Sequence, residues 1–587
     1  IRSFFRGRIG YNAGGIMLGR RFAPVAAAVA SLLVSASFPR GTSSFFVAPP
    51  LVFFLRRTTL TASSPVSRRT TASAVPVPRR SIGSSRCGRA GCRSFPPSLR
   101  LHSSTSTENK SQKYIPDVRY DPSREPPCGA IFVDPFSAYH GGHLVSAAIR
   151  QYGAGAVRVF SPYSARGVGG ALKRNAAASG ESGAPPPEDL LSRTAPLDRA
   201  ELESWLRAIP FPVVAVLCET DSGLEYAEEL SSAIAECPSG GALRHNGRCG
   251  ARRDKYLMNG VCRDAGIATV RQAMCHSEEE AVRTALEFGM GGEGVEGIIV
   301  KPLRGVASNR VSLCRTEFSV RYATQCILGT TVFGTFDERY DAVLLQDFLP
   351  GKEYAVDTVS KNGQHKTAAI WNYEKISTTT TIDDADDGAP QNQPFVYSCS
   401  RLVSGDDPRH PAEKIVSYVE SVLDALGVKW GMAHTEVKVA PDGTIRLIEV
   451  NVRQHNANFA PMCQACVGYN ALDLCLSAYL HDDDGDMEDE FGMAPRVPIL
   501  RFAGNEVSLI CFVEGTVTAV NHLEEIEDME SVVGMEVYPN FEIGCGVQKT
   551  VDIRTDAGFI HLIHEDEEVL DRDYQRICVL MQTMFEV

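Results

Sequence analysis

Acidic side chains are almost absent from the first 110 residues, which contain Glu108 alone against about 17 lysines and arginines. The segment is rich in Ser, Thr, Ala and Pro, a composition that does not support a packed domain. Its apolar run at residues 22–34 is too short to span a membrane comfortably. We therefore interpret residues 1–110 as a presequence or a disordered basic segment, with no stable membrane insertion.

The order of features in this segment bears on localisation. Two arginines precede the apolar run, small residues follow it, and Phe38 opens an Arg/Ser-rich tail. This order is typical of a two-part plastid transit peptide and favours a plastid over the cytoplasm. The alternative is a disordered tail. The rest of the chain is strongly acidic and gives a net charge of -12, which argues against a nucleic-acid partner.

Paired cysteine motifs are also lacking, although the chain has 17 cysteines. Cys463 and Cys466 form one Cys-x-x-Cys pair, with no second pair and no histidine at zinc spacing. Free thiols in a reducing compartment are the better interpretation. The acidic run at 481–490 does not match a calcium loop, because Leu480 would stand at the first ligand position.

At 587 residues, the chain is long enough for three or four domains. Buried-type strands alternating with helices predict an N-terminal α/β domain with a parallel sheet at 111–250. Residues 251–485 lie between this domain and the last one. Short strands and a last helix predict an α+β domain at 486–587. The predicted fold class is therefore α/β and α+β.

The most informative stretch is a predicted β-hairpin around the turn signal Pro-Asp-Gly at 441–443. Glu436 lies on one strand. Glu449, Asn451 and Arg453 follow the other at a spacing of two, so they share a face. Carboxylate and amide oxygens are ligands that Mg²⁺ takes, and an arginine can hold a carboxylate or phosphate with two hydrogen bonds. A solvated, charged hairpin face is the alternative.

Two lysines upstream suggest a phosphate site. Lys255 lies in the first turn of the helix predicted at 252–266, where its charge opposes the helix dipole, as is seen for lysines kept for a ligand. Lys301 ends a strand, and the loop after it contains Gly305 and Ser308, whose backbone could cover phosphates. A surface lysine and an ordinary hairpin are the alternatives.

Four motifs in order resemble the ATP-grasp superfamily over about residues 125–485. They are Lys255, Lys301-Pro with Gly305 and Ser308, Gln346-Asp-Phe-Leu-Pro-Gly-Lys-Glu353, and Glu436 with Glu449-x-Asn451-x-Arg453. Val133-Asp-Pro, Arg252-Arg-Asp-Lys and Tyr354-Ala-Val-Asp look most like the amino-acid (dipeptide) ligase branch, which includes carnosine-synthase-like enzymes. The resemblance implies an ATP-grasp domain at 251–485, with a small subdomain at about 280–355, between the parallel α/β domain and the small C-terminal domain.

The resemblance also implies a role for each motif residue. ATP would be held by Lys255, Lys301, Ser308, Gln346, Phe348, Leu349, Glu353 and Lys375. Glu436, Glu449 and Asn451 would bind two Mg²⁺ ions, with Mn²⁺ as an alternative metal. Arg453 and Lys301 would be catalytic, with Arg453 steadying an acyl-phosphate. His434 faces the same way as Glu436 and is expected to line the substrate pocket.

The implied function is an ATP-dependent carboxylate–amine ligase that forms an amide or peptide bond through an acyl-phosphate and releases ADP and phosphate. Its partners would be small carboxylates and amines, amino acids among them, and a homodimer is the assembly that the family suggests. A carboxylase-type or other carbon–nitrogen ligase is one alternative. A non-catalytic ATP-binding regulatory protein is the other, because the loop at 305–311 has fewer glycines than the family often has.

Overall fold

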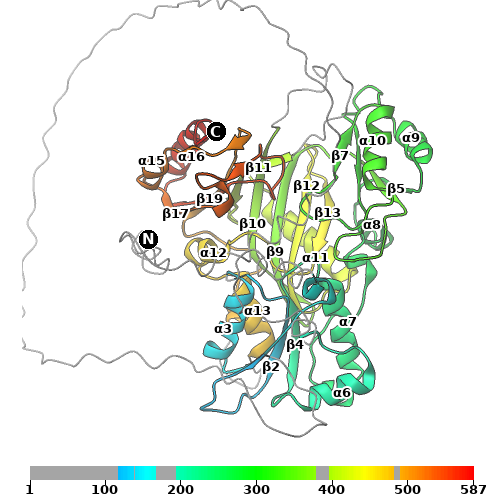
Figure 1. Cartoon of the computed structure of the whole chain (residues 1–587), viewed down its shortest axis with the longest axis vertical. Helices are drawn as coiled ribbons and strands as arrows, with labels where there is room; N and C mark the ends of the chain where they lie inside the picture. Colours follow the sequence, from blue (N-terminus) through cyan, green and yellow to red (C-terminus); the bar gives the residue numbers. More distant parts are fainter. Residues whose placement is uncertain (1–116, 138, 167–192, 378–394, 482–488) are drawn as a thin grey trace, which may run out of the picture. The chain divides into compact units, whose positions relative to one another are not determined.

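The computed structural model describes residues 117–137, 139–166, 193–377, 395–481 and 489–587 (Figure 1). The predicted presequence at 1–110 lies outside the described residues, and so does most of the acidic run at 481–490. Within the described ranges, no helix has the length and apolar character needed to cross a membrane. All described residues belong to one compact unit, which is the part of the chain considered below.

The N-terminal segment forms a four-stranded sheet of order β1-β3-β2-β4, in which β2 is parallel to β3 and to β4. The strands are β1 (Val118–Arg119), β2 (Gly129–Val133), β3 (Gly155–Val159) and β4 (Val213–Cys218). The helices are α3 (Gly141–Gln151), α6 (Arg199–Arg207) and α7 (Leu224–Ala235). One sheet face packs on α3 and the other on α6 and α7. This is the parallel α/β arrangement that the sequence predicts.

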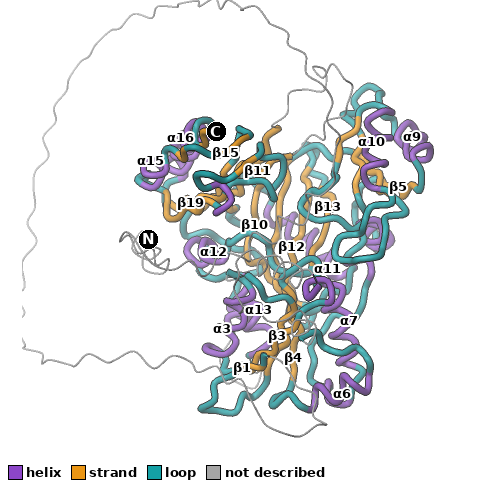
Figure 2. Tube along the Cα trace, in the orientation of Figure 1, coloured by secondary structure: helices purple, strands orange, loops and turns teal. Residues whose placement is uncertain are grey.

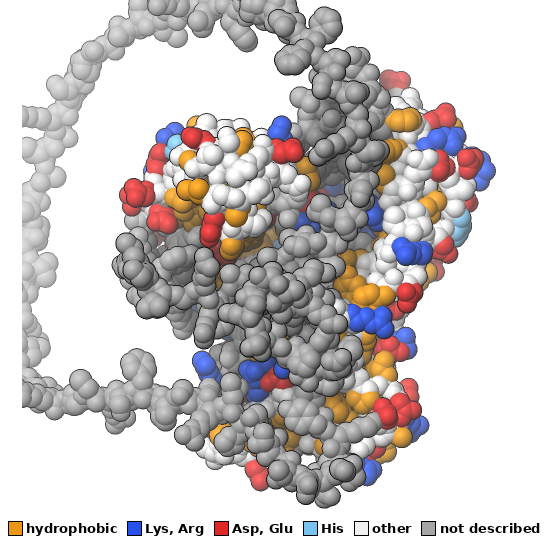
Figure 3. Space-filling model, in the orientation of Figure 1, with side chains coloured by type: hydrophobic (Ala, Val, Ile, Leu, Met, Phe, Trp, Pro, Cys, Tyr) orange, Lys and Arg blue, Asp and Glu red, His pale blue; other side chains and the backbone are white. Residues whose placement is uncertain are grey.

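A second sheet, of order β5-β8-β6-β7, carries the predicted phosphate loop. Its strands are β5 (Gln272–Cys275), β6 (Ile298–Lys301), β7 (Ser312–Cys314) and β8 (Val343–Asp347). Helices α9 (Glu278–Glu287) and α10 (Glu317–Ile327) pack on this sheet, and α8 (Lys255–Asp264) precedes it. Over α9 and α10, the face shown in Figure 3 has acidic and basic side chains interspersed, without a basic stripe.

The central sheet has eight strands in the order β13-β12-β9-β10-β11-β14-β19-β17, all antiparallel to their neighbours. Its first five strands in chain order are β9 (Lys352–Lys361), β10 (Gln364–Ser377), β11 (Phe395–Leu402), β12 (Gly431–Val439) and β13 (Ile445–Asn451). Figure 2 shows β10, β12 and β13 among the strands at the centre of the chain. Helix α11 (Ala412–Ala425) covers one face of this sheet, and α12 (Ala460–Cys466) lies against the other.

The C-terminal segment adds three strands to the same sheet, because β14 (Ala503–Leu509) pairs with β11, and β19 (Gly558–His564) and β17 (Val532–Val537) follow it. Its other elements are α14 (Glu490–Met493), α15 (Leu523–Glu527), α16 (Glu567–Met581), β15 (Gly515–Thr516), β16 (Ala519–Val520), β18 (Gly546–Val547) and β20 (Phe585–Glu586). Before it, α13 (Ala471–Leu480) packs beside α3. The predicted boundary near 485 thus falls between segments that share one sheet.

A tight turn at Gly351 connects β8 to β9 and so joins the two sheets that carry the predicted site. Its φ is +111°, and a Cβ there would lie 2.1 Å from the carbonyl oxygen of Val439. A larger residue would be strained in its backbone and would collide with β12. The glycine therefore allows Glu353 to enter the central sheet beside the hairpin.

Candidate active site

A single pocket brings together all twelve residues that the sequence predicts for the site. They are Lys255, Lys301, Ser308, Gln346, Phe348, Leu349, Glu353, Lys375, Glu436, Glu449, Asn451 and Arg453. The pocket lies between the sheet of the phosphate loop and the central sheet, and α8 contributes Lys255. The structure thus places these residues together, and their individual roles stay predictions.

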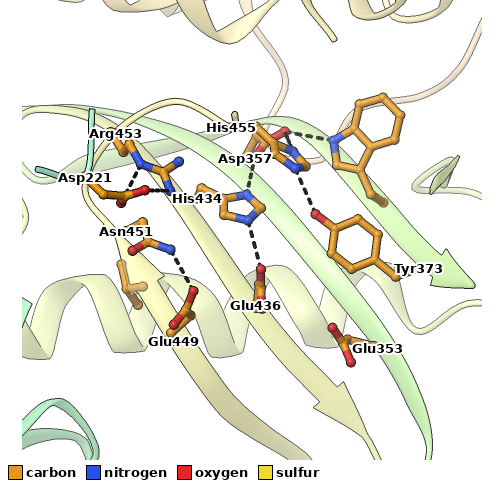
Figure 4. Close-up of polar contacts among 12 residues, drawn as sticks. Asp221, Glu353, Asp357, Tyr373, His434, Glu436, Glu449, Asn451, Arg453 and His455 are labelled. Carbon is orange, nitrogen blue, oxygen red and sulfur yellow. Dashed lines mark hydrogen bonds and ion pairs between the residues drawn. The ribbon is translucent and has the colours of Figure 1, made fainter. Parts of the chain in front are cut away.

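The hairpin β12–β13 forms one wall of the pocket (Figure 4). Glu436 and Glu449 stand directly opposite each other across the two strands, and the Asn451 side-chain amide donates to Glu449 Oε1 at 3.0 Å. Like charges at facing positions destabilise an antiparallel pair. The wall therefore requires positive charge, which either a neighbouring side chain or a metal ion can supply.

Lys255 supplies part of that charge. Its Nζ lies 2.6 Å from Glu449 Oε2 and donates to the carbonyl oxygen of Gly305 at 2.9 Å. Asp254 caps the helix, which begins at Lys255, and the cap fixes Lys255 in the first turn. Burial opposes ionisation of Glu449, but the charge of Lys255 and its hydrogen bond lower the pKa of Glu449 to about 2.

Lys301, unlike Lys255, has no hydrogen-bonded carboxylate beside it among the described residues. It is buried, and no described residue makes a hydrogen bond to its ammonium group. Burial and the neighbouring charge of Lys255 lower the pKa of Lys301 to about 8. A buried ammonium group without a direct partner is costly. An anionic ligand in the pocket would remove that cost.

The predicted nucleotide end holds another internal ion pair. Lys375 Nζ donates to Glu353 Oε1 at 2.6 Å. Burial acts against the charge on Lys375, and Glu353 outweighs it and raises the pKa of the lysine. Lys438 Nζ lies 3.7 Å from Glu353 Oε2 and 5.4 Å from the centre of the Phe348 ring.

The phosphate loop reaches its shape with little glycine. Ala307, Ser308 and Arg310 have φ values of 51°, 55° and 59°, in the left-handed region that favours glycine. The Arg310 guanidinium donates to the Thr330 hydroxyl and is not among the pocket-lining residues. The loop therefore keeps a glycine-like conformation at a cost in backbone strain.

Arg453 is held by a residue that the sequence interpretation missed. Its Nε and Nη2 each donate at 2.8 Å to one carboxylate oxygen of Asp221, and both side chains are buried (Figure 4). Burial disfavours both charges, yet the pairing raises the pKa of Arg453 and lowers that of Asp221. Asp221 follows β4, and the carboxyl end of a parallel strand was the available signal for a site residue.

His434 lines the pocket, as predicted, and connects two carboxylates. Its Nδ1 lies 2.9 Å from Asp357 Oδ1, and its Nε2 lies 3.3 Å from Glu436 Oε1. Burial alone would lower the pKa of His434, but these two hydrogen bonds raise it to about 9. His455 and Tyr373 continue the contacts beyond Asp357 (Figure 4). The sequence interpretation included Asp357 in the motif Tyr354-Ala-Val-Asp, but it gave none of these three residues a role in the site.

Comparison with known proteins relates the central part of the chain to a known domain family. A family model described as an ATP-grasp domain matches residues 295–464, which contain the phosphate loop, β9 and the hairpin. The chain contains an ATP-grasp domain. The sequence prediction of this superfamily, made from motif order, is therefore confirmed, as is the mixed α/β fold class.

Two proteins that are similar to this chain are informative. Dapdiamide A synthase of Enterobacter agglomerans is 24% identical over 273 residues, which are 46% of this chain and 58% of that protein. The crystal structure of an L-amino acid ligase from Bacillus licheniformis has a TM-score of 0.51 and 16% identity, covering 79% of this chain and 98% of its own. The match to dapdiamide A synthase spans somewhat more than half of that protein's length. The likeness to the L-amino acid ligase structure shows a shared fold.

Proposed function

We propose that this protein is an ATP-dependent ligase that joins a small carboxylate to an amine through an acyl-phosphate, releasing ADP and phosphate. The observation that supports this most is the juxtaposition of Glu436, Glu449 and Asn451 with the cations Lys255, Lys301 and Arg453 in the pocket of an ATP-grasp domain. The names of dapdiamide A synthase and of the L-amino acid ligase support amino acids as substrates.

Mg²⁺ fits the hairpin wall. Glu436 and Glu449 face each other, and Asn451 adds an amide oxygen, so the donors are the hard oxygen ligands that this ion takes. When bound there, Mg²⁺ neutralises phosphate charge and orients the phosphate oxygens. We propose two ions, by the family resemblance, with Mn²⁺ as an alternative.

The internal ion pairs define what must change when substrates bind. Lys255 leaves Glu449 for a phosphate oxygen, so the carboxylate becomes available to metal. Lys375 leaves Glu353 in the same way, and Glu353 then accepts hydrogen bonds from the ribose hydroxyls. Both lysines and Glu449 thus exchange one charged partner for another. Glu353 keeps Lys438 at 3.7 Å when it binds the ribose hydroxyls, so no charge is left alone in the pocket.

The chemistry follows from where the cations lie. The substrate carboxylate attacks the γ-phosphorus of ATP, and ADP leaves with the electrons of the broken P–O bond. Lys255 and Lys301 stabilise the charge on the phosphate oxygens. Asp221 and the carbonyl oxygen of Gln454 hold the Arg453 guanidinium in place at the pocket wall, where its positive charge would stabilise the acyl-phosphate. An amine then attacks the acyl carbon, and phosphate leaves.

A phosphate-release screen over pairs of acids and amines tests this proposal. We expect phosphate release that requires ATP, one acid and one amine together. Release that depends on bicarbonate without an amine would instead indicate a carboxylase-type ligase. Tight ATP binding with no turnover over a broad panel would indicate a regulatory protein.

Localisation and assembly are part of the same proposal and have separate tests. Residues 1–110 fused to a fluorescent protein should direct it to a plastid, and retention in the cytoplasm would contradict the transit-peptide interpretation. Light scattering of the purified chain should give the mass of a homodimer. A mass of one chain would contradict that expectation.

A further inference from the structure

Beyond the charged groups, the pocket contains a hydrogen-bonded set of neutral and charged side chains that the proposed phosphoryl transfer does not use. Tyr373 on β10 and His455, in the segment after β13, both line the pocket, and Asp357 on β9 lies behind them. Tyr373 Oη lies 2.9 Å from His455 Nε2, and His455 Nδ1 lies 3.4 Å from Asp357 Oδ2. The order hydroxyl, imidazole, carboxylate is that of an acid–base relay.

Proton positions in this set follow from the hydrogen bonds. Asp357 also accepts from the Trp371 indole at 2.8 Å and from His434 Nδ1 at 2.9 Å. An ionised carboxylate can only accept, so the proton of His455 that faces it is on Nδ1. The His434 ring lies beside this set, with its centre 4.1 Å from that of His455.

Burial lowers the pKa of His455, so its resting form is neutral. With the proton on Nδ1, its Nε2 is an acceptor. Tyr373 must then donate its hydroxyl hydrogen to His455 Nε2. This leaves the lone pairs of the Tyr373 oxygen free to accept a proton from a molecule in the pocket.

The rings in this set are held rigidly. The Phe459 ring stacks on Trp371 with centres 3.7 Å apart and meets the His455 ring edge-on at 4.5 Å. The charged and titratable groups around His455 are Asp357 on β9, Tyr373 on β10, His434 on β12 and Arg453 on its own segment. A fixed geometry of this kind is what efficient proton transfer requires.

We infer that Tyr373 is the catalytic proton acceptor for the attacking amine, and that His455 and Asp357 are positioning residues behind it. This inference rests on the proposed ligase function. As the amine nitrogen bonds to the acyl carbon, its proton passes to the Tyr373 oxygen, and the tyrosine's own hydroxyl proton passes to His455 Nε2. The C–O bond to phosphate breaks, and phosphate leaves with that electron pair. The imidazolium of His455, paired with Asp357, then returns its proton through Tyr373 to phosphate or water.

Two nucleophiles separate this step from the phosphoryl transfer. Hydroxylamine is a much weaker base than an α-amine and traps an acyl-phosphate as a hydroxamate with little need for proton removal. We expect Tyr373→Phe to lower amide formation from an α-amine by about 100-fold and to change hydroxamate formation by less than about threefold. His455→Gln should give the same selective loss. The deficit should grow with the basicity of the amine, which a purely structural defect would not produce.

The chain offers a matched control outside the pocket. Tyr354, buried on β9, has its hydroxyl 2.8 Å from His410 Nδ1, and His410 Nε2 lies 3.9 Å from Asp407. Tyr354→Phe removes a hydrogen bond of the same kind and should leave both products unchanged, apart from a small loss of thermal stability.

Each remaining outcome contradicts the inference in a distinguishable way. Equal loss of amide and hydroxamate in Tyr373→Phe, or no loss of either, overturns the relay while the ligase function stands. A wild-type protein that releases no ADP with any acid, even with hydroxylamine, overturns both. The ligand atoms of Asp357, His434 and His455 also lie within 4.8 Å of one another. One transition-metal ion per chain that is required for amide formation would therefore overturn the relay, because that ion would occupy the imidazole nitrogens.

Discussion

The two ends of the pocket are built differently. At the phosphate end, Lys255 with Glu449, Lys375 with Glu353 and Arg453 with Asp221 are pairs of opposite charge that substrates must separate or use. The histidine end is a network of side chains that hydrogen-bond to one another without a ligand, namely Asp357, His434, His455 and Tyr373. At the phosphate end, side chains give up an ion-pair partner for a charged substrate group. At the histidine end, a proton can move along the network while each side chain keeps its hydrogen-bond partners.

The largest effect is expected at the phosphate end, from Glu449→Gln. The neutral amide lacks the charge that makes the carboxylate a strong metal ligand and the ion-pair partner of Lys255, so phosphate release should fall by about 10³-fold. The measurement is kcat for phosphate release over a range of Mg²⁺ concentrations. Glu374→Gln is a matched control, because Glu374 is also on a strand of the central sheet and pairs with Arg401 outside the pocket. Equal kcat for wild type and Glu449→Gln would remove Glu449 from the metal site.

Asp221→Asn tests whether the ion pair of Asp221 with Arg453 keeps the arginine in position for catalysis. The guanidinium would lose one of two charge-assisted hydrogen bonds, and we expect kcat to fall by about 10- to 100-fold with KM for ATP nearly unchanged. Steady-state kinetics give this comparison. Asp117→Asn, which weakens a carboxylate–arginine pair away from the pocket, should leave kcat as it was. A tenfold change in KM for ATP alone would contradict the assignment.

Glu353→Gln should have a smaller effect, confined to nucleotide binding. Losing a charged acceptor for the ribose should raise KM for ATP by about tenfold and leave kcat within about twofold, which is the pattern of uniform binding. The readouts are KM for ATP and the dissociation constant of ADP. If kcat falls while KM stays constant, Glu353 acts in the transition state rather than on the ribose.

The smallest effect concerns stability at the wall beyond the histidine end. Glu506 lines the pocket there, and burial together with Glu506 and Asp552 raises the pKa of Asp556 to about 8. Between its ordinary pKa and about 8, the folded chain holds a proton that the unfolded chain has released. The free energy of unfolding therefore falls as pH rises through this window.

Asp556→Asn should remove this pH-dependent fall in the free energy of unfolding, because the amide does not ionise. At pH 9 the variant should be more stable than wild type by at least about 2 kcal/mol, and the difference should shrink towards pH 5. Urea unfolding at both pH values measures it. Asp337→Asn, at an exposed aspartate, should show no such trend. A difference for Asp556→Asn that does not vary with pH would place its carboxylate in solvent.

The sequence predicted the phosphate end far better than the histidine end. The alternation around residues 441–443 sets the hairpin, and the short turn sets its register as far as Val437 opposite Leu447. A β-bulge between Glu436 and Val437 then brings Glu436 opposite Glu449, and the alternation of the sequence does not predict this shift. The N-cap Asp254 fixes Lys255 through its own helix. The loop at 305–311 was only partly predictable, because its glycine-like φ values occur at Ala307, Ser308 and Arg310.

The sequence by itself thus determined the strands, the faces of their side chains and the order of motifs that indicates an ATP-grasp domain, because periodicity and turns act over a few residues. Only the tertiary structure decided which distant groups meet. Asp221 reaches Arg453 across 232 positions and Asp357 reaches His455 across 98, since sheet pairing and domain packing brought their elements together. Side-chain pattern does not encode such contacts, because they depend on how whole elements pack.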